Sequence, residues 1–449
     1  MPTAKLGAGT VGAFSAEENE LLTRVGPGTL MGDLFRQYWI PVLPVPYIDE
    51  PGGIPKRVRL LGEDLVLFRT RRGEAGLVGA YCSHRLAPLF FGRIDEDGIR
   101  CPYHGWKYSP QGKCIEMPNV PAEQEFKDDI CHRGYRCAEH GGIIWAHMGP
   151  SKKLPPLPQF EFAMVSDDLR SYRPFRQECN YLQAMEGGID PTHVMWLHSP
   201  YDLADDDIAK SHQRAQQRLA NKSGVRTPLA IEIVDTPGGF MYGTKRPIEN
   251  GSSLWRVNQF FMPFNTMPPG GEFRMARMWV PMDDEHCIKW DIGWFPSETI
   301  KERTNETARL SLEQEKYATP TNEPYGFIIP RANKSNDYLI DWDVHTKRRL
   351  GVSGVNLQDI CITENEGPKP ILDRTRENLC SGDMTIIKAR RLLLRAAREL
   401  REQGTAPPGV NDPTVYRLRG AAKVVPDEVH WVEGVKQDIA VNPKAAMAK

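Results

Sequence analysis

Two groups of cysteine, histidine and aspartate residues in this chain have the spacing of metal ligands. The two groups are Cys82-x-His84 with Cys101-x2-His104, and Asp190-x2-His193-x4-His198. Thiolates and imidazoles are preferred ligands of zinc and iron, and two imidazoles with one carboxylate leave open positions on Fe(II). Together the groups predict an enzyme that receives electrons at one metal centre and uses them at the other.

The first group favours a cluster of two irons and two sulfides. Two neighbouring turns each supply one Cys and one His, so one iron can take both thiolates and the other both imidazoles. Neutral imidazoles raise the potential of such a cluster to about -150 to +300 mV, within reach of flavin or ferredoxin donors. The alternative is a structural zinc site, although zinc more often uses C-x2-4-C and H-x3-5-H spacings. The other cysteines have no ligand spacing and are expected to be small buried residues.

The second group cannot lie on one regular helix. His193 and His198 are five residues apart, which is about 140° around an ideal helix. We therefore expect the segment Asn180–His198 to be helical but broken, by a π-bulge, at Gly187-Gly188 or at Pro191. The alternative is that both histidines are ordinary core or surface residues and that Asp190 caps a helix ahead of Pro191.

The elements that carry these residues divide the chain into three parts. From Lys56 to about residue 150, apolar residues alternate in short runs between turns, which predicts a small β domain. A proline-rich linker at 152–158 follows. The predicted parts are a helical leader over residues 1–45, the β domain over 46–155 and a second domain over 156–449.

The leader contains a capping box, Ser15-Ala-Glu-Glu18, which predicts a helix to about Arg24, and a second short helix is expected over Met31–Tyr38. Gly7 to Gly12 match G-x-G-x-x-G. No strand can precede this match, as a dinucleotide site requires, so we interpret it as a flexible leader.

The second domain mixes strands and helices. Strands are expected at Phe240–Gly243, Ser253–Phe264, Arg274–Pro281 and Cys287–Phe295, paired antiparallel. Helices are expected at Pro296–Gln314 and at Asp383–Gln403, where the second is amphipathic and is closed by Gly404. The tail after Pro407 is expected to be irregular and to lie on the surface.

Composition limits the class of protein. A formal net charge of -1 without a basic run argues against a nucleic-acid partner. No apolar stretch approaches the ~20 residues that span a bilayer, and the first residues lack the apolar core of a secretory signal. Nine cysteines without a disulfide pattern fit a reducing compartment. We therefore expect a soluble, cytoplasmic protein with no membrane partner.

Two longer motifs resemble a known family. Cys101-Pro-Tyr-His-Gly-Trp-Lys-Tyr108 with Cys82-Ser-His-Arg85 resembles the Rieske iron–sulfur motif of ring-hydroxylating oxygenases. The catalytic segment of the Rieske non-haem iron oxygenases, in the phthalate dioxygenase and dehydrodivanillate O-demethylase-like branch, is similar to Asn180-x2-Gln183-x2-Glu186-x3-Asp190-x2-His193-x4-His198. The resemblance extends from Glu18 to Ile387 and weakens at 199–235, at 296–350 and after about 405.

The resemblance implies an α+β fold for the oxygenase (alpha) subunit. An N-terminal all-β Rieske [2Fe-2S] domain would precede a C-terminal helix-grip catalytic domain, an antiparallel sheet with helices. The cluster ligands implied by the resemblance are Cys82, His84, Cys101 and His104.

The resemblance also implies roles around a mononuclear Fe(II). His193 and His198 would be iron ligands, and Asp190 would bridge His104 of an adjacent protomer to an iron histidine. The segment Leu357-Gln358-Asp359-Ile360, ahead of Gly367-Pro368 and Asp373-Arg374, resembles the family's Gln-Asp segment. It makes Asp359 the implied third ligand, with Glu364 and Asp343 as fallback candidates.

The implied activity is that of a terminal oxygenase acting on an aromatic carboxylate with O2. The chain has no flavin, NAD or ferredoxin motif, so an NADH-dependent reductase of flavin or ferredoxin type would supply electrons. The bridging role of Asp190 implies a homotrimer or a dimer of trimers. Arg246 or Arg256 could bind the substrate carboxylate, although each could also be a surface charge on a strand.

Two reactions remain open at this stage, and two other classes of protein are possible. The reactions are hydroxylation or cis-dihydroxylation of a phthalate-like ring, and oxidative O-demethylation of a methoxylated aromatic acid. The other classes are a Rieske electron carrier without oxygenase activity and a zinc-binding scaffold.

Overall fold

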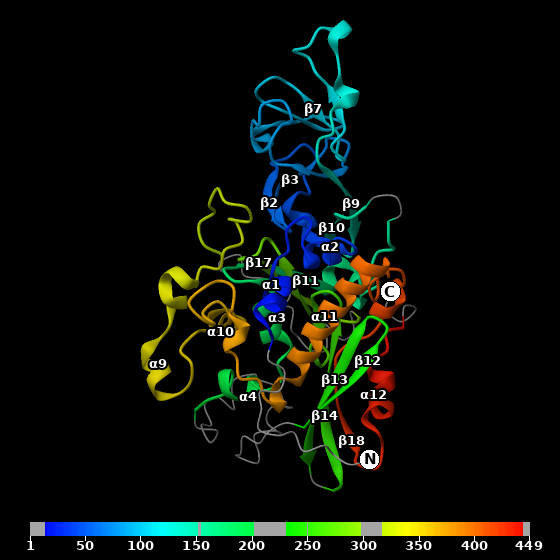
Figure 1. Cartoon of the computed structure of the whole chain (residues 1–449). Coiled ribbons are helices and arrows are strands. Elements are labelled where there is room, and N and C mark those ends of the chain that lie inside the picture. The colour runs from blue at the N-terminus through cyan, green and yellow to red at the C-terminus, as the bar shows by residue number, and fades with distance from the viewer. Residues whose placement is uncertain (1–13, 151–153, 202–229, 249, 298–316, 443–449) are drawn as a thin grey trace.

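The computed structural model describes residues 14–150, 154–201, 230–248, 250–297 and 317–442. Strands of the first 150 residues form one end of the molecule, and a larger sheet with helices forms the other (Figure 1). Within the described ranges, no helix is both long and apolar enough to cross a membrane. The expected helix at Pro296–Gln314 and the glycines at 7–12 fall almost wholly outside these ranges.

The N-terminal domain is all-β, as expected. Its larger sheet is antiparallel and has the order β1-β10-β9-β4-β3-β2. These strands are β1 (Trp39–Pro44), β2 (Lys56–Leu60), β3 (Glu63–Arg69), β4 (Ala75–Gly79), β9 (Gly134–His140) and β10 (Ile143–His147). A smaller sheet joins β5 (Arg93–Ile94), β6 (Ile99–Arg100), β7 (Lys107–Tyr108) and β8 (Cys114–Glu116). Strand β1 lies within the segment 1–45, so the helical part of that segment ends at Phe35.

The two leader helices pack on the C-terminal domain. Helix α1 (Ala16–Thr23) begins with the expected capping box between Ser15 and Glu18, and α2 (Leu30–Phe35) follows. Buried apolar residues of both helices join one core with the long helix α11 (Met384–Gln403). The amphipathic pattern of α11 and its closure by Gly404, at φ 68°, confirm the sequence prediction.

The C-terminal domain is built on a second antiparallel sheet. Its order is β11-β17-β16-β15-β14-β13-β12, with β18 paired beside β14. These strands are β11 (Arg170–Gln177), β12 (Ala230–Thr236), β13 (Gly239–Ile248), β14 (Ser252–Phe261), β15 (Asn265–Met267), β16 (Arg274–Pro281), β17 (Cys287–Trp294) and β18 (Ala421–Pro426). The four strands expected in this domain are therefore present and antiparallel.

The prediction for the tail after Pro407 was wrong. The tail contains β18 and helix α12 (Trp431–Ile439), and the Trp431 ring stacks on Trp255 with ring centroids 5.2 Å apart. Single-sequence patterns missed both elements because their apolar residues become buried only through pairing with β14.

The two faces of this sheet serve different purposes. Successive strand residues point to opposite faces, and Met241, Trp255 and Val257 pack with α12 on one of them. The other face carries Phe240 and Tyr242 and packs against helices α3 (Tyr181–Ile189) and α11 in the main core. Helix α10 (Val355–Thr363) also lies on this side, as Figure 1 shows. The candidate site forms between this face and these helices.

The turn between β16 and β17, residues 281–287, joins the two domains. Arg59 of β2 pairs with Asp283 in this turn, with Nη1 and Oδ2 3.0 Å apart. Asn180, the N-cap of α3, donates from Nδ2 to the backbone oxygen of Asp284 at 2.6 Å. The turn therefore fixes the N-terminal domain and the start of α3 to the same point.

His286 in this turn makes the junction sensitive to pH. Hydrogen bonds to Asp283 and then Glu178 outweigh burial and raise the pKa of His286 to about 9. Since the unfolded imidazole titrates near pH 6.5, its stabilising charge is fully present below pH 6.5 and is lost as pH rises through about 9. We expect His286→Gln to lower the thermal unfolding midpoint most at pH 6, and the difference from the native chain to vanish above pH 9.

Circular dichroism melts at pH 6, 7.5 and 9 would measure this difference. His345→Gln is the matched control, because His345 is half-buried on helix α9 (Trp342–Lys347) and has no carboxylate contact among the described residues. A difference that is constant across this range would contradict the assignment.

Candidate functional site

The break predicted in the segment 180–198 occurs at Asp190 and Pro191. Helix α3 ends at Ile189, Asp190 is extended with φ -73° and ψ 117°, and the short helix α4 spans Val194–Leu197. Proline disfavours a helical conformation in the residue before it, so the chain turns here. The turn allows the two histidines to face one point although they are five residues apart.

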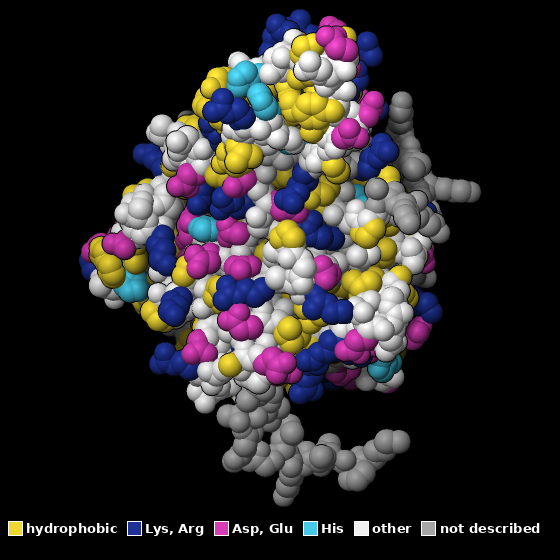
Figure 2. Space-filling view, turned by 45° about the horizontal axis from the view of Figure 1, so that its top comes forward, with side chains coloured by type: hydrophobic (Ala, Val, Ile, Leu, Met, Phe, Trp, Pro, Cys, Tyr) yellow, Lys and Arg dark blue, Asp and Glu magenta, His cyan; other side chains and the backbone are white. Residues whose placement is uncertain are grey.

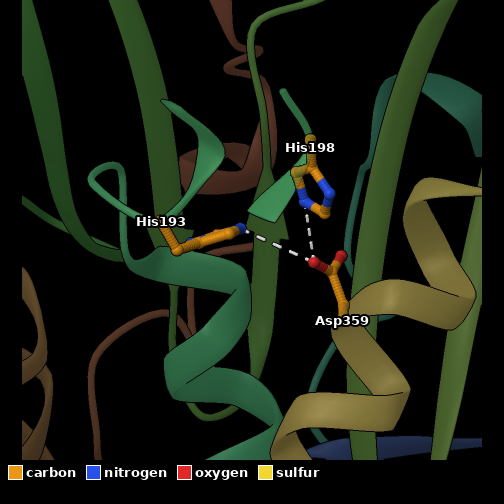
Figure 3. Close-up of side chains that lie close together, drawn as sticks. All are labelled: His193, His198 and Asp359. Atoms are coloured by element: carbon orange, nitrogen blue, oxygen red, sulfur yellow. Dashed lines mark ion pairs between the residues drawn. The ribbon is translucent and has the colours of Figure 1, made fainter. Parts of the chain in front are cut away.

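His193, His198 and Asp359 come together at this point (Figure 3). Asp359 Oδ1 lies 3.5 Å from His193 Nε2 and 2.9 Å from His198 Nε2. The three candidate ligand atoms all lie within 4.8 Å of one another. Asp359 comes from α10, 161 residues after His198, so the carboxylate expected from the Gln-Asp segment is the one that the fold brings here.

The fallback acids make other contacts. Glu364 accepts a hydrogen bond from the backbone nitrogen of Glu178 at 2.9 Å and another from the Tyr338 hydroxyl. Asp343 is exposed on α9 and pairs with Lys347. Neither belongs to the group of three.

The electrostatics of this group favour a bound cation. Asp359 Oδ1 is buried and has no hydrogen-bond partner among the described residues. Burial raises the pKa of Asp359, but the nearby His193 and His198 outweigh it and hold that pKa well below its usual value. Burial likewise lowers the pKa of His193, but Asp190 and Asp359 raise it to about 9. A buried carboxylate oxygen within reach of two imidazole nitrogens suits a divalent metal.

Gln358 sets the tautomer of His198. The Gln358 Nε2 donates to the backbone oxygen of Val352 at 3.0 Å, so its Oε1 faces His198 Nδ1, 2.8 Å away. An amide oxygen can only accept, so Nδ1 carries the proton and the Nε2 lone pair is left for a metal. The sequence motif contained Gln358 but gave no sign of this contact.

Asp190 performs the corresponding task for His193. Its Oδ2 lies 3.3 Å from His193 Nδ1, and its Oδ1 accepts from Thr192 N and Oγ1, each at 2.7 Å. The Asp190 side chain is 18% exposed. The His193 side chain is 22% exposed, so both residues are partly accessible, and Asp190 stands outside the group of three.

The other polar residues of the α3 motif hold the helix in place. Gln183 Nε2 donates to the backbone oxygen of Thr363 at the end of α10, at 2.8 Å. Glu186 is buried and pairs with Arg374 at 3.0 Å and with Arg390 at 2.6 Å. These contacts fix α3 relative to α10 and α11. Sequence analysis did not find Arg390, which sits in an ordinary amphipathic pattern.

The Cys and His residues of the first group lie on two loops with the same backbone pattern. In each loop the Cys nitrogen donates five residues ahead, from Cys82 to Ala87 at 2.9 Å and from Cys101 to Trp106 at 2.8 Å. The fifth residue of each loop has positive φ, 55° at Leu86 and 78° at Gly105. The repeated geometry presents a Cys and a His from each loop.

These loops fit a two-iron cluster. Both cysteines are buried, and the rings of His84 and His104 lie 4.5 Å apart at their centroids. His84 Nδ1 is buried without a hydrogen-bond partner among the described residues, and the ring stacks on Trp106. Burial, more than any neighbour, raises the pKa of the Cys82 thiol, and the adjacent Cys101 raises it further. Two adjacent thiols beside two adjacent imidazoles match the ligand division of such a cluster.

The remaining cysteines fall into three classes of burial, and Cys137 and Cys361 are half-buried. Cys114, Cys179 and Cys287 are buried, as expected. Cys131 and Cys380 are exposed, so the expectation of burial was wrong for them. Cys131 comes shortly after the 3-10 helix Lys127–Asp129, and Cys380 directly precedes the 3-10 helix Ser381–Asp383.

The two arginines proposed for substrate lie on the metal-facing side of the sheet. In the register of β13 and β14, Arg256 is opposite Thr244 and Arg246 is opposite Leu254, on the same face as Tyr242. Arg246 Nη2 lies 3.0 Å from the sulfur of Met195, which is part of α4. Burial lowers the pKa of Arg246, and no carboxylate pairs with it in the described part of the chain.

Two cations near Asp359, the half-buried Arg277 and the buried Lys289, were not predicted from the sequence. Arg277 Nη1 lies 3.7 Å from Asp359 Oδ2, and Lys289 is buried beside Asp291. The sequence did contain an indication of Lys289, because a charged residue is unusual within an apolar strand. Lys289 stands between Ile288 and Trp290, which are both buried.

Family models match both domains of the chain. The model described as "LigXa C-terminal domain like" matches residues 146–449, and the "Rieske [2Fe-2S] domain" model matches residues 38–127.

Three relatives match nearly the whole chain. The 3-chlorobenzoate-3,4-dioxygenase oxygenase subunit of Comamonas testosteroni is 36% identical, covering 94% of this chain and 98% of its own. The phthalate 4,5-dioxygenase oxygenase subunit of Pseudomonas putida is 31% identical, covering 93% and 94%. The 5,5'-dehydrodivanillate O-demethylase oxygenase subunit of Sphingobium sp. is 31% identical, covering 90% and 85%.

Solved structures share the fold. A carbazole-bound oxygenase variant, in complex with the ferredoxin of carbazole 1,9a-dioxygenase, matches with a TM-score of 0.56 at 18% identity. The match covers 88% of this chain and 98% of the other. It confirms the arrangement of an all-β domain followed by an antiparallel sheet with helices.

Proposed function

The chain belongs to the Rieske non-haem iron oxygenases, and from that premise we propose that it hydroxylates an aromatic carboxylate as the terminal component of a multicomponent system. The observation that carries the proposal is the meeting of His193, His198 and Asp359 beside Asp190. When bound, the [2Fe-2S] cluster supplies single electrons and the mononuclear iron supplies the place where O2 is reduced. An electron carrier or a zinc scaffold would not require this second centre.

We assign the residues that would hold each group as follows. The cluster ligands are Cys82, His84, Cys101 and His104, and the iron ligands are His193, His198 and Asp359. In the second centre, Asp190 accepts a hydrogen bond from His193 Nδ1, and Gln358 accepts one from His198 Nδ1. Both imidazoles can therefore offer Nε2 to iron. The His193 side chain is 22% exposed and that of Asp359 is 12% exposed, so the sheet and helices leave this group only partly accessible to solvent.

Electron transfer between subunits is supported by the shape of the protomer. The loops that hold the cluster and helix α4 lie at opposite ends of the molecule in Figure 1. Figure 2 shows histidine side chains at the surface of the cluster end, with hydrophobic side chains beside them. The exposed apolar residues around these loops, here called the tip, are Tyr81, Leu86, Phe91 and Tyr103.

A second exposed apolar group lies beside α4. It consists of the exposed residues Trp196, Tyr201 and Trp342. Tyr201 and Trp342 both contact His345. Two unlike apolar patches at opposite ends of one protomer favour head-to-tail contacts, which close into rings. We therefore propose a homotrimer, or a dimer of trimers, in which Asp190 lies between His193 and His104 of an adjacent protomer.

The proposed substrate is an aromatic carboxylate because Arg246 is a partly buried cation beside α4 without an acidic partner among the described residues. A guanidinium can bind a carboxylate through two parallel hydrogen bonds. Arg256 shares the face and is the second candidate. Two relatives are named for 3-chlorobenzoate and phthalate, which are aromatic carboxylates.

A second candidate reaction is oxidative O-demethylation of a methoxylated aromatic acid. It is favoured by the 31% identity to a dehydrodivanillate O-demethylase subunit. Ring hydroxylation remains the first proposal because the relative named for 3-chlorobenzoate is 36% identical over 94% of the chain. The two reactions differ in whether a ring carbon or a methyl carbon lies nearest the iron.

The proposed electron donor is an NADH-dependent reductase of flavin or ferredoxin type. The related solved oxygenase is in complex with a ferredoxin, which supports a protein donor. The cluster loops lie at the surface, so such a donor can approach them.

Product analysis tests the proposed function. The reconstituted protein with a surrogate reductase would be given benzoate, chlorobenzoates, phthalates and methoxybenzoates. Both reactions consume one O2 and one NADH per turnover, but they differ in product. Dihydroxylation yields a cis-diol, and demethylation of an aryl methyl ether yields a phenol, formaldehyde and water. We expect one acid in the panel to give stoichiometric product, and O2 uptake that no aromatic acid stimulates would contradict the proposal.

Asp190→Asn tests the path between the centres. Asn has only one acceptor oxygen and an NH2 donor in place of the second carboxylate oxygen, so it cannot accept a hydrogen bond from an imidazole on each side, and we expect substrate-dependent O2 uptake to fall at least about tenfold. The [2Fe-2S] absorption spectrum and the iron content should remain those of the native chain. Asp343→Asn, on exposed α9, is the matched control. Unchanged turnover in Asp190→Asn would remove Asp190 from the path.

Arg246→Met tests carboxylate recognition. A hydrogen bond to a charged group contributes about 1.5–3 kcal/mol, so the KM of the acid substrate should rise at least about tenfold. The KM of the corresponding carboxamide should change little. Lys245→Met is the matched control, because Lys245 is the adjacent residue on the opposite face of β13 and pairs with Asp427. An equal change for acid and amide would assign Arg246 to structure instead.

A further inference from the structure

Asn356 is the centre of a cluster of charged side chains between α10 and the sheet. Its Oδ1 accepts from Arg277 Nη2 at 3.2 Å and from Lys289 Nζ at 3.2 Å. Its Nδ2 donates to Asp291 Oδ2 at 2.5 Å. Arg277 lies on β16, and both Lys289 and Asp291 lie on β17, so one amide ties the first turn of α10 to two adjacent strands.

The amide of Asn356 can take only one orientation here. The opposite orientation would place two N–H donors against two cations and an oxygen against a carboxylate. Lys289 and Asp291 are buried, where electrostatic interactions are stronger than in water. The neutral amide also adds no charge to the surroundings of Asp359, which a carboxylate at this position would do.

This cluster acts on Asp359 through two connections. Asn356 is three residues before Asp359 on the same helix, so the two side chains project from the same face of α10. Arg277 is shared: it donates to Asn356 and faces Asp359, with Nη1 and Oδ2 3.7 Å apart. The two Asp359 oxygens are therefore distinguished, because Oδ1 faces the imidazoles and Oδ2 faces Arg277.

We propose that Asn356 is a positioning residue for the mononuclear iron: by holding α10 to Arg277, Lys289 and Asp291, it fixes the direction in which the Asp359 carboxylate meets the metal. The inference rests on the proposed function, because it takes Asp359 as an iron ligand. It adds a residue that touches neither the metal nor the three ligands. Without the amide, Arg277 and Lys289 lose the oxygen to which both donate, and the Asp359 carboxylate is free to rotate.

Asn356→Ala tests this role by measuring the iron itself. Residues that orient metal ligands typically change metal affinity by about 10–100-fold, so the dissociation constant for Fe(II) should rise at least about tenfold. The electron paramagnetic resonance spectrum of the nitric oxide adduct of the mononuclear iron should also broaden or split. The [2Fe-2S] absorption spectrum and the thermal unfolding midpoint report whether the variant is folded.

Asn365→Ala is the matched control. Asn365 lies just beyond the other end of α10, and its Nδ2 donates to the backbone oxygen of Cys361 at 2.7 Å and to the Tyr338 hydroxyl. The same truncation there should leave iron affinity and the nitric oxide spectrum unchanged. A similar loss of iron in both variants would indicate a general loosening of α10 and would overturn the proposal.

Arg277→Lys is the second variant, which keeps the charge but removes the planar fork that reaches both Asn356 and Asp359. It should reproduce the change in the nitric oxide spectrum, and it carries the test if Asn356→Ala does not fold. Native iron affinity and spectrum in a folded Asn356→Ala protein would overturn the inference. Asp359→Asn separates this failure from that of the proposed function, since iron retention in Asp359→Asn would reject Asp359 as a ligand altogether.

Discussion

The relative position of α3 and α10 is the constraint on which the site depends. Two imidazoles follow α3 and one carboxylate comes from α10, and their ligand atoms must lie within a few ångströms although the segments are far apart in sequence. Gln183 bonds to the end of α10, and the buried pairing of Glu186 with Arg374 and Arg390 anchors α3. Removing one partner of such a pair would leave a buried charge uncompensated. Polar contacts in the core therefore specify a geometry that apolar packing alone would leave adjustable.

The same arrangement connects the two domains. The turn of residues 281–287 contacts Arg59 of the N-terminal domain and Asn180 at the start of α3. The cluster-bearing domain is thus held against the helix that leads to the proposed iron ligands of its own chain. Its cluster loops nevertheless lie at the far end of the molecule (Figure 1). A rigid protomer with its two centres apart suits transfer between copies, because assembly can then set a fixed distance from one centre to the next.

The features that could be predicted from the sequence are those that depend on residues close together in the chain. The ligand spacings, the capping box at Ser15 and the break before Pro191 depend on neighbouring residues, so the chain displays them directly. Asp359 required a resemblance, since no local pattern distinguishes a ligand from an acid in a loop. The contacts of Asn356 and the pairing of β18 with β14 could not be read at all. They arise from strand register and from which helix covers which face, and these are properties of the whole fold.

Leu86 has a consequence for the free protomer. It is the fifth residue of the first cluster loop, it has φ 55°, and its side chain is 72% exposed. A left-handed backbone costs a residue with a Cβ about 1 kcal/mol, a cost that Gly105 avoids at the same position of the second loop. In the isolated protomer, Leu86 therefore combines an unfavourable backbone conformation with an apolar side chain exposed to solvent. A second protomer that covers this loop binds only the folded chain and therefore stabilises it. The thermal unfolding midpoint should then rise with protein concentration.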